Sequence, residues 1–232
     1  MKKILLFINT LTVITIFSVQ VYADLNLLGQ GTSVHGTYNL IYDTDLDITW
    51  YDYASAGDTW VNQVAWAETL SVTFGSNAYT NWRLPTTVDG IWERGYDGTT
   101  TGGYNITSSE MGHLFYAELG NIGSYDTSAN PTGCSESSIP SCLTNPGDFQ
   151  NLELGNYTGF WSGTEYSDVP SNAWLFGFSN GAQTIFSVDS GKHAIAVHPG
   201  MLVVVPEPVS SILFLIGGAT FGFRRFRKNF KK

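Results

Sequence analysis

The chain has 232 residues, of which 43% are hydrophobic and only 13% are charged, and its formal net charge is −9. Eight of its eleven Lys and Arg residues lie before residue 24 or after residue 223, whereas nineteen of its twenty acidic residues lie in residues 24–204. This central region, about the size of one domain, therefore has a formal charge of −16. Such a charge repels phosphate backbones and argues against nucleic acid as a partner.

The first residues have the pattern of a secretory signal peptide. Two lysines precede an apolar run over residues 4–19, and a small-x-small cleavage pattern follows, Val21-Tyr22-Ala23. We expect a signal peptide over residues 1–23 and a mature chain that begins at Asp24. An uncleaved N-terminal anchor is the alternative.

The mature chain begins with a predicted β-hairpin. Residues 37–42 and 48–51 are extended, aromatic patterns on either side of an acidic turn. An EF-hand is excluded because its sixth and twelfth positions, which need Gly and Glu, are Ile48 and Ala54. We expect the turn carboxylates to cap the turn, with a looser cation site, for calcium, as the alternative; they are Asp43, Asp45 and Asp47. No other cofactor is predicted.

Two helices are predicted in the first half of the chain. Asp58 is expected to cap a helix over residues 59–72, whose apolar residues recur at helical spacing. The second helix, over residues 107–119, begins with a capping-box pattern from Thr107 to Glu110 and stops at Gly120.

One cation lies between large apolar groups. Arg83 follows Trp82 and precedes Leu84, so its guanidinium needs a carboxylate or carbonyl partner if it is buried. We expect a structural ion pair between Arg83 and Glu165, with a ligand contact as the alternative.

The two cysteines, Cys134 and Cys142, lie in a polar, turn-rich loop over residues 121–150. In an exported protein they are expected to form a disulfide that restrains this loop. A metal site would need further Cys or His residues nearby, and the loop contains none. A redox pair usually has the spacing Cys-x-x-Cys, which these two cysteines lack.

The last third of the domain is rich in predicted strands, at residues 160–166, 173–178, 183–188 and 194–198, and Asn180-Gly181 is a strong hairpin signal. Two helices followed by an antiparallel sheet indicate an α+β fold.

A set of motifs in residues 37–200 resembles the Lcl C-terminal domain family. The motifs include Asn81-Trp82-Arg83-Leu84-Pro85-Thr86, Trp161-Ser162-Gly163-Thr164-Glu165-Tyr166, Ala173-Trp174-Leu175-Phe176 and Ala196-Val197-His198-Pro199-Gly200. The resemblance implies a C-type-lectin-like domain over residues 24–204 and, as in some members, binding to polysaccharide or sulfated glycan. The family usually has Arg where this chain has His198, and the calcium-bridging motifs of lectins are absent from the sequence.

The end of the chain has three parts in order. A short motif, Val205-Pro206-Glu207-Pro208, is followed by an uncharged apolar run over residues 209–223 and a basic tail over residues 224–232. This order resembles the PEP-CTERM sorting signal. The resemblance implies an exosortase as partner, a precursor anchored transiently in the inner membrane, and a final place on the cell surface or in the extracellular matrix. A permanent anchor is the alternative, although fifteen helical residues span only about 22 Å of a core about 30 Å thick.

No catalytic set is evident in the sequence. None of the four histidines accompanies a nucleophile motif, and Glu165 with Asp168 is the remaining acid–base candidate. We therefore expect a non-catalytic binding or structural protein, with a small periplasmic or surface enzyme as the alternative.

Overall fold

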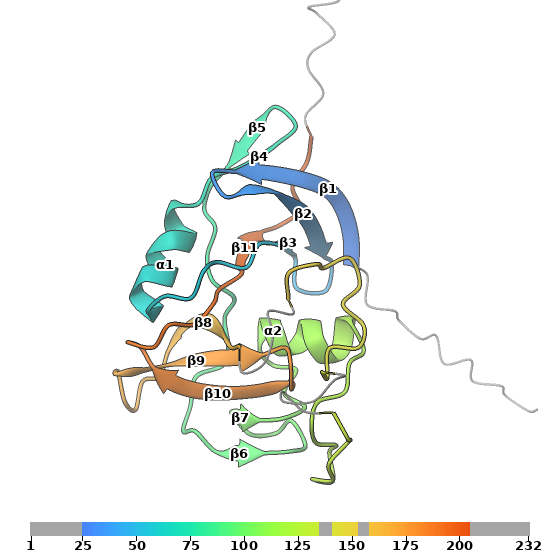
Figure 1. Ribbon diagram of the computed structural model, residues 1–232, viewed down its shortest axis with the longest axis vertical. Helices are drawn as coiled ribbons and strands as arrows, with labels where there is room; N and C mark the ends of the chain where they lie inside the picture. The colour runs from blue at the N-terminus through green and yellow to red at the C-terminus, as the bar shows by residue number, and fades with distance from the viewer. Residues whose placement is uncertain (1–24, 135–140, 153–157, 205–232) are drawn as a thin grey trace, which may run out of the picture.

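The structure is a computed structural model that describes residues 25–134, 141–152 and 158–204 (Figure 1). The predicted signal peptide (residues 1–23), sorting motif (205–208), transmembrane segment (209–223) and basic tail (224–232) lie outside these residues. Within the three described ranges, no helix has the length and hydrophobicity that crossing a bilayer requires.

The described residues form a mostly-β domain with two sheets. The six-stranded sheet has the order β11-β3-β2-β1-β4-β5, and its neighbouring strands are antiparallel. Its strands are β1 (Leu25–Ser33), β2 (Gly36–Asp43), β3 (Ile48–Tyr51), β4 (Val72–Phe74), β5 (Asn77–Tyr79) and β11 (Ala196–Pro199).

The five-stranded sheet has the order β6-β7-β10-β9-β8, in which β6 and β7 are parallel and the other pairs antiparallel. Its strands are β6 (Arg94–Gly95), β7 (Gly102–Gly103), β8 (Phe160–Glu165), β9 (Asn172–Gly177) and β10 (Ala182–Ser187). In Figure 1 this sheet lies below the six-stranded sheet.

Both predicted hairpins are confirmed. β2 and β3 pair across the acidic turn, with Asp43 opposite Ile48. β9 and β10 pair as predicted, but Gly177 lies opposite Ala182, so residues 178–181 connect the strands in place of the two-residue turn that Asn180-Gly181 indicates. Gly181 has a φ of 75° that favours glycine. Strand β1 was not predicted, because its sequence is rich in Gly and polar residues and much of its length is exposed.

The first helix, α1 (Trp60–Thr69), is shorter than predicted because Val72 belongs to strand β4. The predicted helix cap is only partly right: the Asp58 carboxylate accepts a hydrogen bond from the Thr59 amide, but the N-cap residue is Thr59.

The second helix, α2 (Glu110–His113), continues as one π-helical turn, η1 (Leu114–Glu118). The predicted capping box is wrong, because the N-cap is Ser109, whose hydroxyl accepts from the Gly112 amide at 3.1 Å. With two short helices and two sheets, the domain has less helix and more sheet than the α+β prediction described.

The core has two parts that each join the two sheets. One contains Ile41 and Trp50 from the six-stranded sheet, Phe115 from η1 and Phe176 from β9. The other packs Tyr51, Leu70 and Trp82 against Trp161 and Leu175. Because both parts draw on both sheets, the sheets are fixed relative to one another by buried apolar surface.

Candidate functional site

A cleft of about 520 Å³ lies on the five-stranded sheet, along β10 and its neighbours β7 and β9. This volume is in the usual range for sites that bind small molecules or short segments of a polymer, roughly 300–1,000 Å³. Its floor includes Leu175, Gly177 and Gln183, and its rim includes two aromatic and two basic side chains: Trp92, Phe186, Arg94 and Lys192.

The two aromatic side chains of the rim are unusually exposed. Trp92 is 38% exposed and Phe186 is 46% exposed, whereas the tryptophans at 50, 82, 161 and 174 are buried. Exposed aromatic rings that line a concave surface are available to stack on a ligand.

The basic side chains of the rim lie against aromatic rings. The Lys192 ammonium is 4.4 Å from the ring centroid of Phe186. The Arg94 guanidinium lies 5.6 Å from the ring centroids of both Tyr96 and Tyr104. These cation–π contacts hold the two cations at the cleft rather than free in solvent.

The backbone around the cleft allows this close packing. A Cβ atom at Gly102 would lie 2.6 Å from the indole nitrogen of Trp92, so glycine leaves room for the ring beside β7. The Gly102 amide also donates to the Glu93 carbonyl at 3.0 Å, which ties the segment containing Trp92 to β7. On the floor, the buried Gln183 amide group donates to the Thr101 carbonyl at 2.7 Å.

The charge of the cleft differs from that of the domain as a whole. Residues 24–204 contain only three Lys or Arg residues, and two of them, Arg94 and Lys192, line this cleft. No local sequence pattern indicates the cleft, because its four rim side chains come from segments up to about 100 residues apart. The scarcity of basic residues was the one signal in the sequence that pointed to Arg94 and Lys192.

The third cation, Arg83, does not pair with Glu165 as predicted. Its guanidinium instead donates two hydrogen bonds of 2.7 Å to the carboxylate of Glu110. Glu165 lies near the end of β8 with its side chain exposed. The prediction was wrong because Glu110 was assigned to a capping box. Asp168 accepts from the Tyr166 hydroxyl at 3.3 Å.

The three turn carboxylates do not gather around one point as a cation site would require. The Asp47 carboxylate accepts a hydrogen bond from the Tyr42 hydroxyl at 2.8 Å, and this bond raises the pKa of Tyr42. Asp43 is fully buried and lies instead beside His113 and Glu118, with one potential ligand atom from each residue within 4.8 Å of the others.

The carboxyls of Asp43 and Glu118, which lie beside His113, have raised pKa values. Burial raises the pKa of Asp43, although hydrogen bonds from the Leu46 amide and the Trp50 indole lower it. Burial, followed by the charge of Asp43, raises the pKa of Glu118. Burial acts in this direction because the charged form of a carboxyl loses its hydration.

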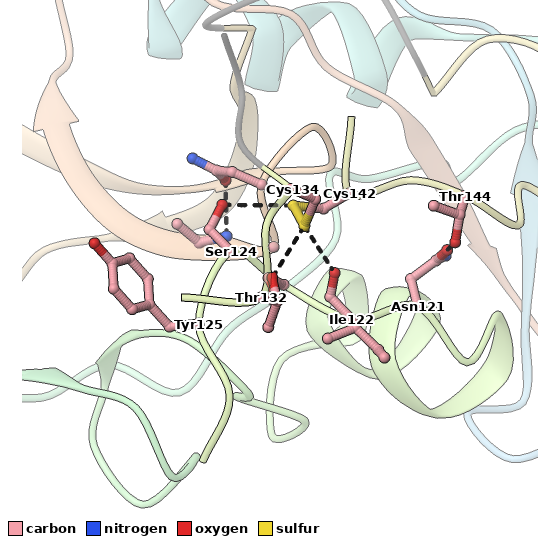
Figure 2. Close-up of a disulfide and its surroundings, with 12 residues drawn as sticks. Asn121, Ile122, Ser124, Tyr125, Thr132, Cys134, Cys142 and Thr144 are labelled. Atoms are coloured by element: carbon pink, nitrogen blue, oxygen red, sulfur yellow. Dashed lines mark hydrogen bonds between the residues drawn. A yellow bond between two sulfur atoms is a disulfide. The ribbon is translucent and has the colours of Figure 1, made fainter. Parts of the chain in front are cut away.

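The predicted disulfide between Cys134 and Cys142 is confirmed (Figure 2). Cys142 is buried, and its amide donates to the Ser179 carbonyl at 2.9 Å, beside the β9–β10 turn. The sulfur of Cys134 lies 3.3 Å from the hydroxyl of Thr132, on the same loop (Figure 2). The disulfide therefore holds the long loop against the five-stranded sheet.

No protein-family model, curated protein or solved structure matches this chain. The resemblance to the Lcl C-terminal domain and to the PEP-CTERM signal thus stays a hypothesis that rests on the motifs themselves.

Proposed function

We propose that this chain is an exported, C-terminally sorted protein of the cell surface or extracellular matrix, and that its domain binds polysaccharide without catalysis. The observation that carries the binding proposal is the cleft on the five-stranded sheet. Two of the three basic residues between 24 and 204 meet there with two exposed aromatic rings.

The chemistry of the rim suits a polysaccharide that bears carboxylate or sulfate groups. The faces of sugar rings are apolar and stack on aromatic side chains such as Trp92 and Phe186. Arg94 and Lys192 would supply charged hydrogen bonds to acidic substituents. Because the rest of the domain is strongly acidic, an acidic polymer would be repelled elsewhere and favoured only at the cleft.

Export and sorting are supported by the two ends of the sequence. The signal-peptide pattern of residues 1–23 would direct the chain across the inner membrane, and residues 205–232 would hold it there until an exosortase acts on the motif. The disulfide between Cys134 and Cys142 agrees with an oxidising compartment.

Binding to immobilised polysaccharides tests the proposal for the cleft. We expect the mature chain to bind uronate-containing or sulfated polysaccharides more tightly than neutral dextran, with an affinity that falls as salt rises. Trp92→Ala and Lys192→Met should each weaken binding about tenfold, the loss expected for one stacking or charged contact.

Two variants serve as matched controls. Ile91→Ala removes a side chain that is 77% exposed beside Trp92 but does not line the cleft, and Lys192→Arg keeps the positive charge. Both should bind like the unaltered chain. If no glycan binds, or if Trp92→Ala and Lys192→Met bind as tightly as Ile91→Ala, the binding proposal fails. A shortening of the polysaccharide during the assay would favour the enzymatic alternative.

Cell fractionation tests sorting independently of binding. Mass spectrometry should find a mature N-terminus at Asp24, and replacement of Glu207 by Gln should leave the precursor in the inner membrane. An intact chain in the cytosol with both ends uncut would refute the proposed export.

A further inference from the structure

Asp43, His113 and Glu118 form a compact group of potential metal ligands between the six-stranded sheet and the second helix. Asp43 is the last residue of β2, His113 the last of α2 and Glu118 the last of η1. One oxygen or nitrogen atom from each lies within 4.8 Å of the other two. The His113 Nε2 atom and the Glu118 Oε1 atom are 2.9 Å apart.

The π-helical turn explains why His113 and Glu118 meet. In an α-helix, side chains five residues apart are separated by about 140° around the axis and do not face each other. In η1 the Leu119 amide instead donates to the Leu114 carbonyl five residues earlier, at 2.9 Å. This wider turn brings residues five apart onto one side of the helix, and such turns are frequent at functional sites.

A second observation points to a bound ion at this group. The side chain of Glu118 has no exposed surface, and its Oε2 atom is buried without a hydrogen-bond partner. Burying a carboxylate oxygen without a partner is costly, so native structures rarely leave one in that state. A cation bound between Glu118 and its neighbours would satisfy this oxygen.

We propose that Asp43, His113 and Glu118 bind one divalent transition-metal ion of the zinc class. An imidazole ligand favours zinc and its neighbours over calcium, which prefers oxygen ligands alone. Atoms that share a zinc ion at about 2.0 Å are roughly 3.3 Å apart. The His113 Nε2 and Glu118 Oε1 atoms, at 2.9 Å, would therefore separate slightly, whereas any pair near the 4.8 Å limit would have to move closer.

The surroundings of the group fit a metal site. Asp43 accepts hydrogen bonds from the Leu46 amide at 3.0 Å and from the Trp50 indole at 3.4 Å, and such bonds orient a ligand. Asp45 is half-exposed, and its Oδ2 atom is 3.9 Å from the His113 Nε2 atom. Asp45 or a water molecule would complete four-fold coordination on the side from which an ion enters.

Because the proposed ligands come from two different elements, the ion would stabilise the packing of these elements. Asp43 and Asp45 belong to the β2–β3 hairpin, whereas His113 and Glu118 belong to the helix that packs against it (Figure 1). The ion would therefore join the six-stranded sheet to the second helix. It lies apart from the cleft, so this proposal is independent of polysaccharide binding.

Metal titration of the full chain in mild detergent tests the proposal. After the protein has been stripped with a chelator, ZnCl2 should bind at one ion per chain with a Kd of about 1 μM or below, and the melting temperature should rise with zinc concentration. Cobalt(II) should give the visible absorption of a four-coordinate site with nitrogen and oxygen ligands. No binding, or an equal rise in melting temperature with calcium, would overturn the proposal.

Matched variants locate the ion. Glu118→Gln and His113→Gln should weaken zinc binding at least tenfold, while Asp47→Asn, in the same acidic turn but hydrogen-bonded to Tyr42, should bind like the unaltered chain. Circular dichroism of each stripped variant establishes that it is folded. If folded Glu118→Gln and Asp47→Asn bind zinc equally well, the ion lies elsewhere and the proposal is wrong.

Discussion

Arg83 and Glu110, 27 residues apart in the sequence, face each other through two hydrogen bonds of 2.7 Å. The same carboxylate accepts from the Thr86 amide at 2.7 Å. The backbone of Arg83 forms a β-bridge with Val197 of β11. One side chain of α2 is thus tied to the edge of the six-stranded sheet, and this contact helps to fix the position of the helix that carries His113.

The first prediction concerns this pair. Glu110→Gln leaves a single carbonyl oxygen for three donors, the two guanidinium N–H groups of Arg83 and the Thr86 amide, and Arg83→Lys removes the planar pair of donors that matches the carboxylate. Since Glu110 is mostly buried and Arg83 is about one-third exposed, each change should lower the free energy of unfolding by about 1–3 kcal/mol. Urea denaturation measures it. In a double-mutant cycle the two losses should be less than additive; full additivity would show that the residues do not interact.

The second prediction concerns the disulfide. Cys134 and Cys142 close a short loop, with a separation of eight residues, so removing the bond should cost about 2–3 kcal/mol through the added entropy of the unfolded chain. The Cys134→Ser and Cys142→Ser double variant should melt at a lower temperature than the oxidised protein. Reductant should destabilise the unaltered chain and leave the double variant unchanged. If reductant lowered the melting temperature of the unaltered chain and of the double variant equally, its effect would not come from this disulfide.

The third prediction is a pH dependence that arises from Asp52. This side chain is 1% exposed, and burial raises its pKa from 3.8 to about 6, against the lowering effect of hydrogen bonds from the Gln150 and Asn151 amides. The folded chain therefore holds the proton more tightly than the unfolded chain. The contribution of Asp52 to stability is fully present below about pH 4 and is lost as pH rises to about 6, on the order of 3 kcal/mol in total.

Asp52→Asn is uncharged throughout this range and keeps one acceptor for the amides. The free energy of unfolding of the unaltered chain minus that of the variant should therefore fall between pH 4 and pH 6. Urea denaturation of both proteins at several pH values gives this difference, in which the titration of other carboxyls largely cancels. A constant or rising difference would contradict the raised pKa.

The fourth prediction compares two glycines that have positive φ angles. Gly103 has a φ of 103°, and a Cβ atom there would collide with the carbonyl of Gly95 in the adjacent strand. Gly120 has a φ of 62°, but a Cβ atom there would meet nothing within 4 Å. Gly120→Ala should cost about 1 kcal/mol from backbone strain alone.

Gly103→Ala should cost at least twice as much, because strain and collision act together. Thermal denaturation of the two variants separates the effects. Equal losses would mean that β6 can move away from β7 at little cost.

Local patterns were sufficient to predict much of the β structure. The β2–β3 hairpin follows from an acidic turn between extended residues, and the β9–β10 hairpin follows from Asn180-Gly181, whose backbone preference suits a tight turn. The disulfide followed from two nearby cysteines in a chain that begins with a signal-peptide pattern. Each of these features involves residues close in sequence, so the information needed was present in a single stretch.

Helix boundaries and ionic partners were predicted less well. Glu110 has the spacing of a capping box, but it pairs with Arg83 while Ser109 caps the helix. The π-helical turn that brings His113 to Glu118 gives no clear signal in the residue pattern. Competing interactions decided these features, and their relative strength depends on groups that only the folded chain brings near.

The sequence by itself contained the patterns on which the proposed signal peptide and sorting signal rest, and it determined the scarcity of basic residues and the strand-rich second half, since composition and short patterns express them directly. The tertiary structure alone decided that Trp92, Arg94, Phe186 and Lys192 share a cleft and that Asp43 lies beside His113 and Glu118. These groups come from segments far apart along the chain. Their meeting depends on how two sheets pack over common cores, a property of the whole folded domain that no single stretch contains.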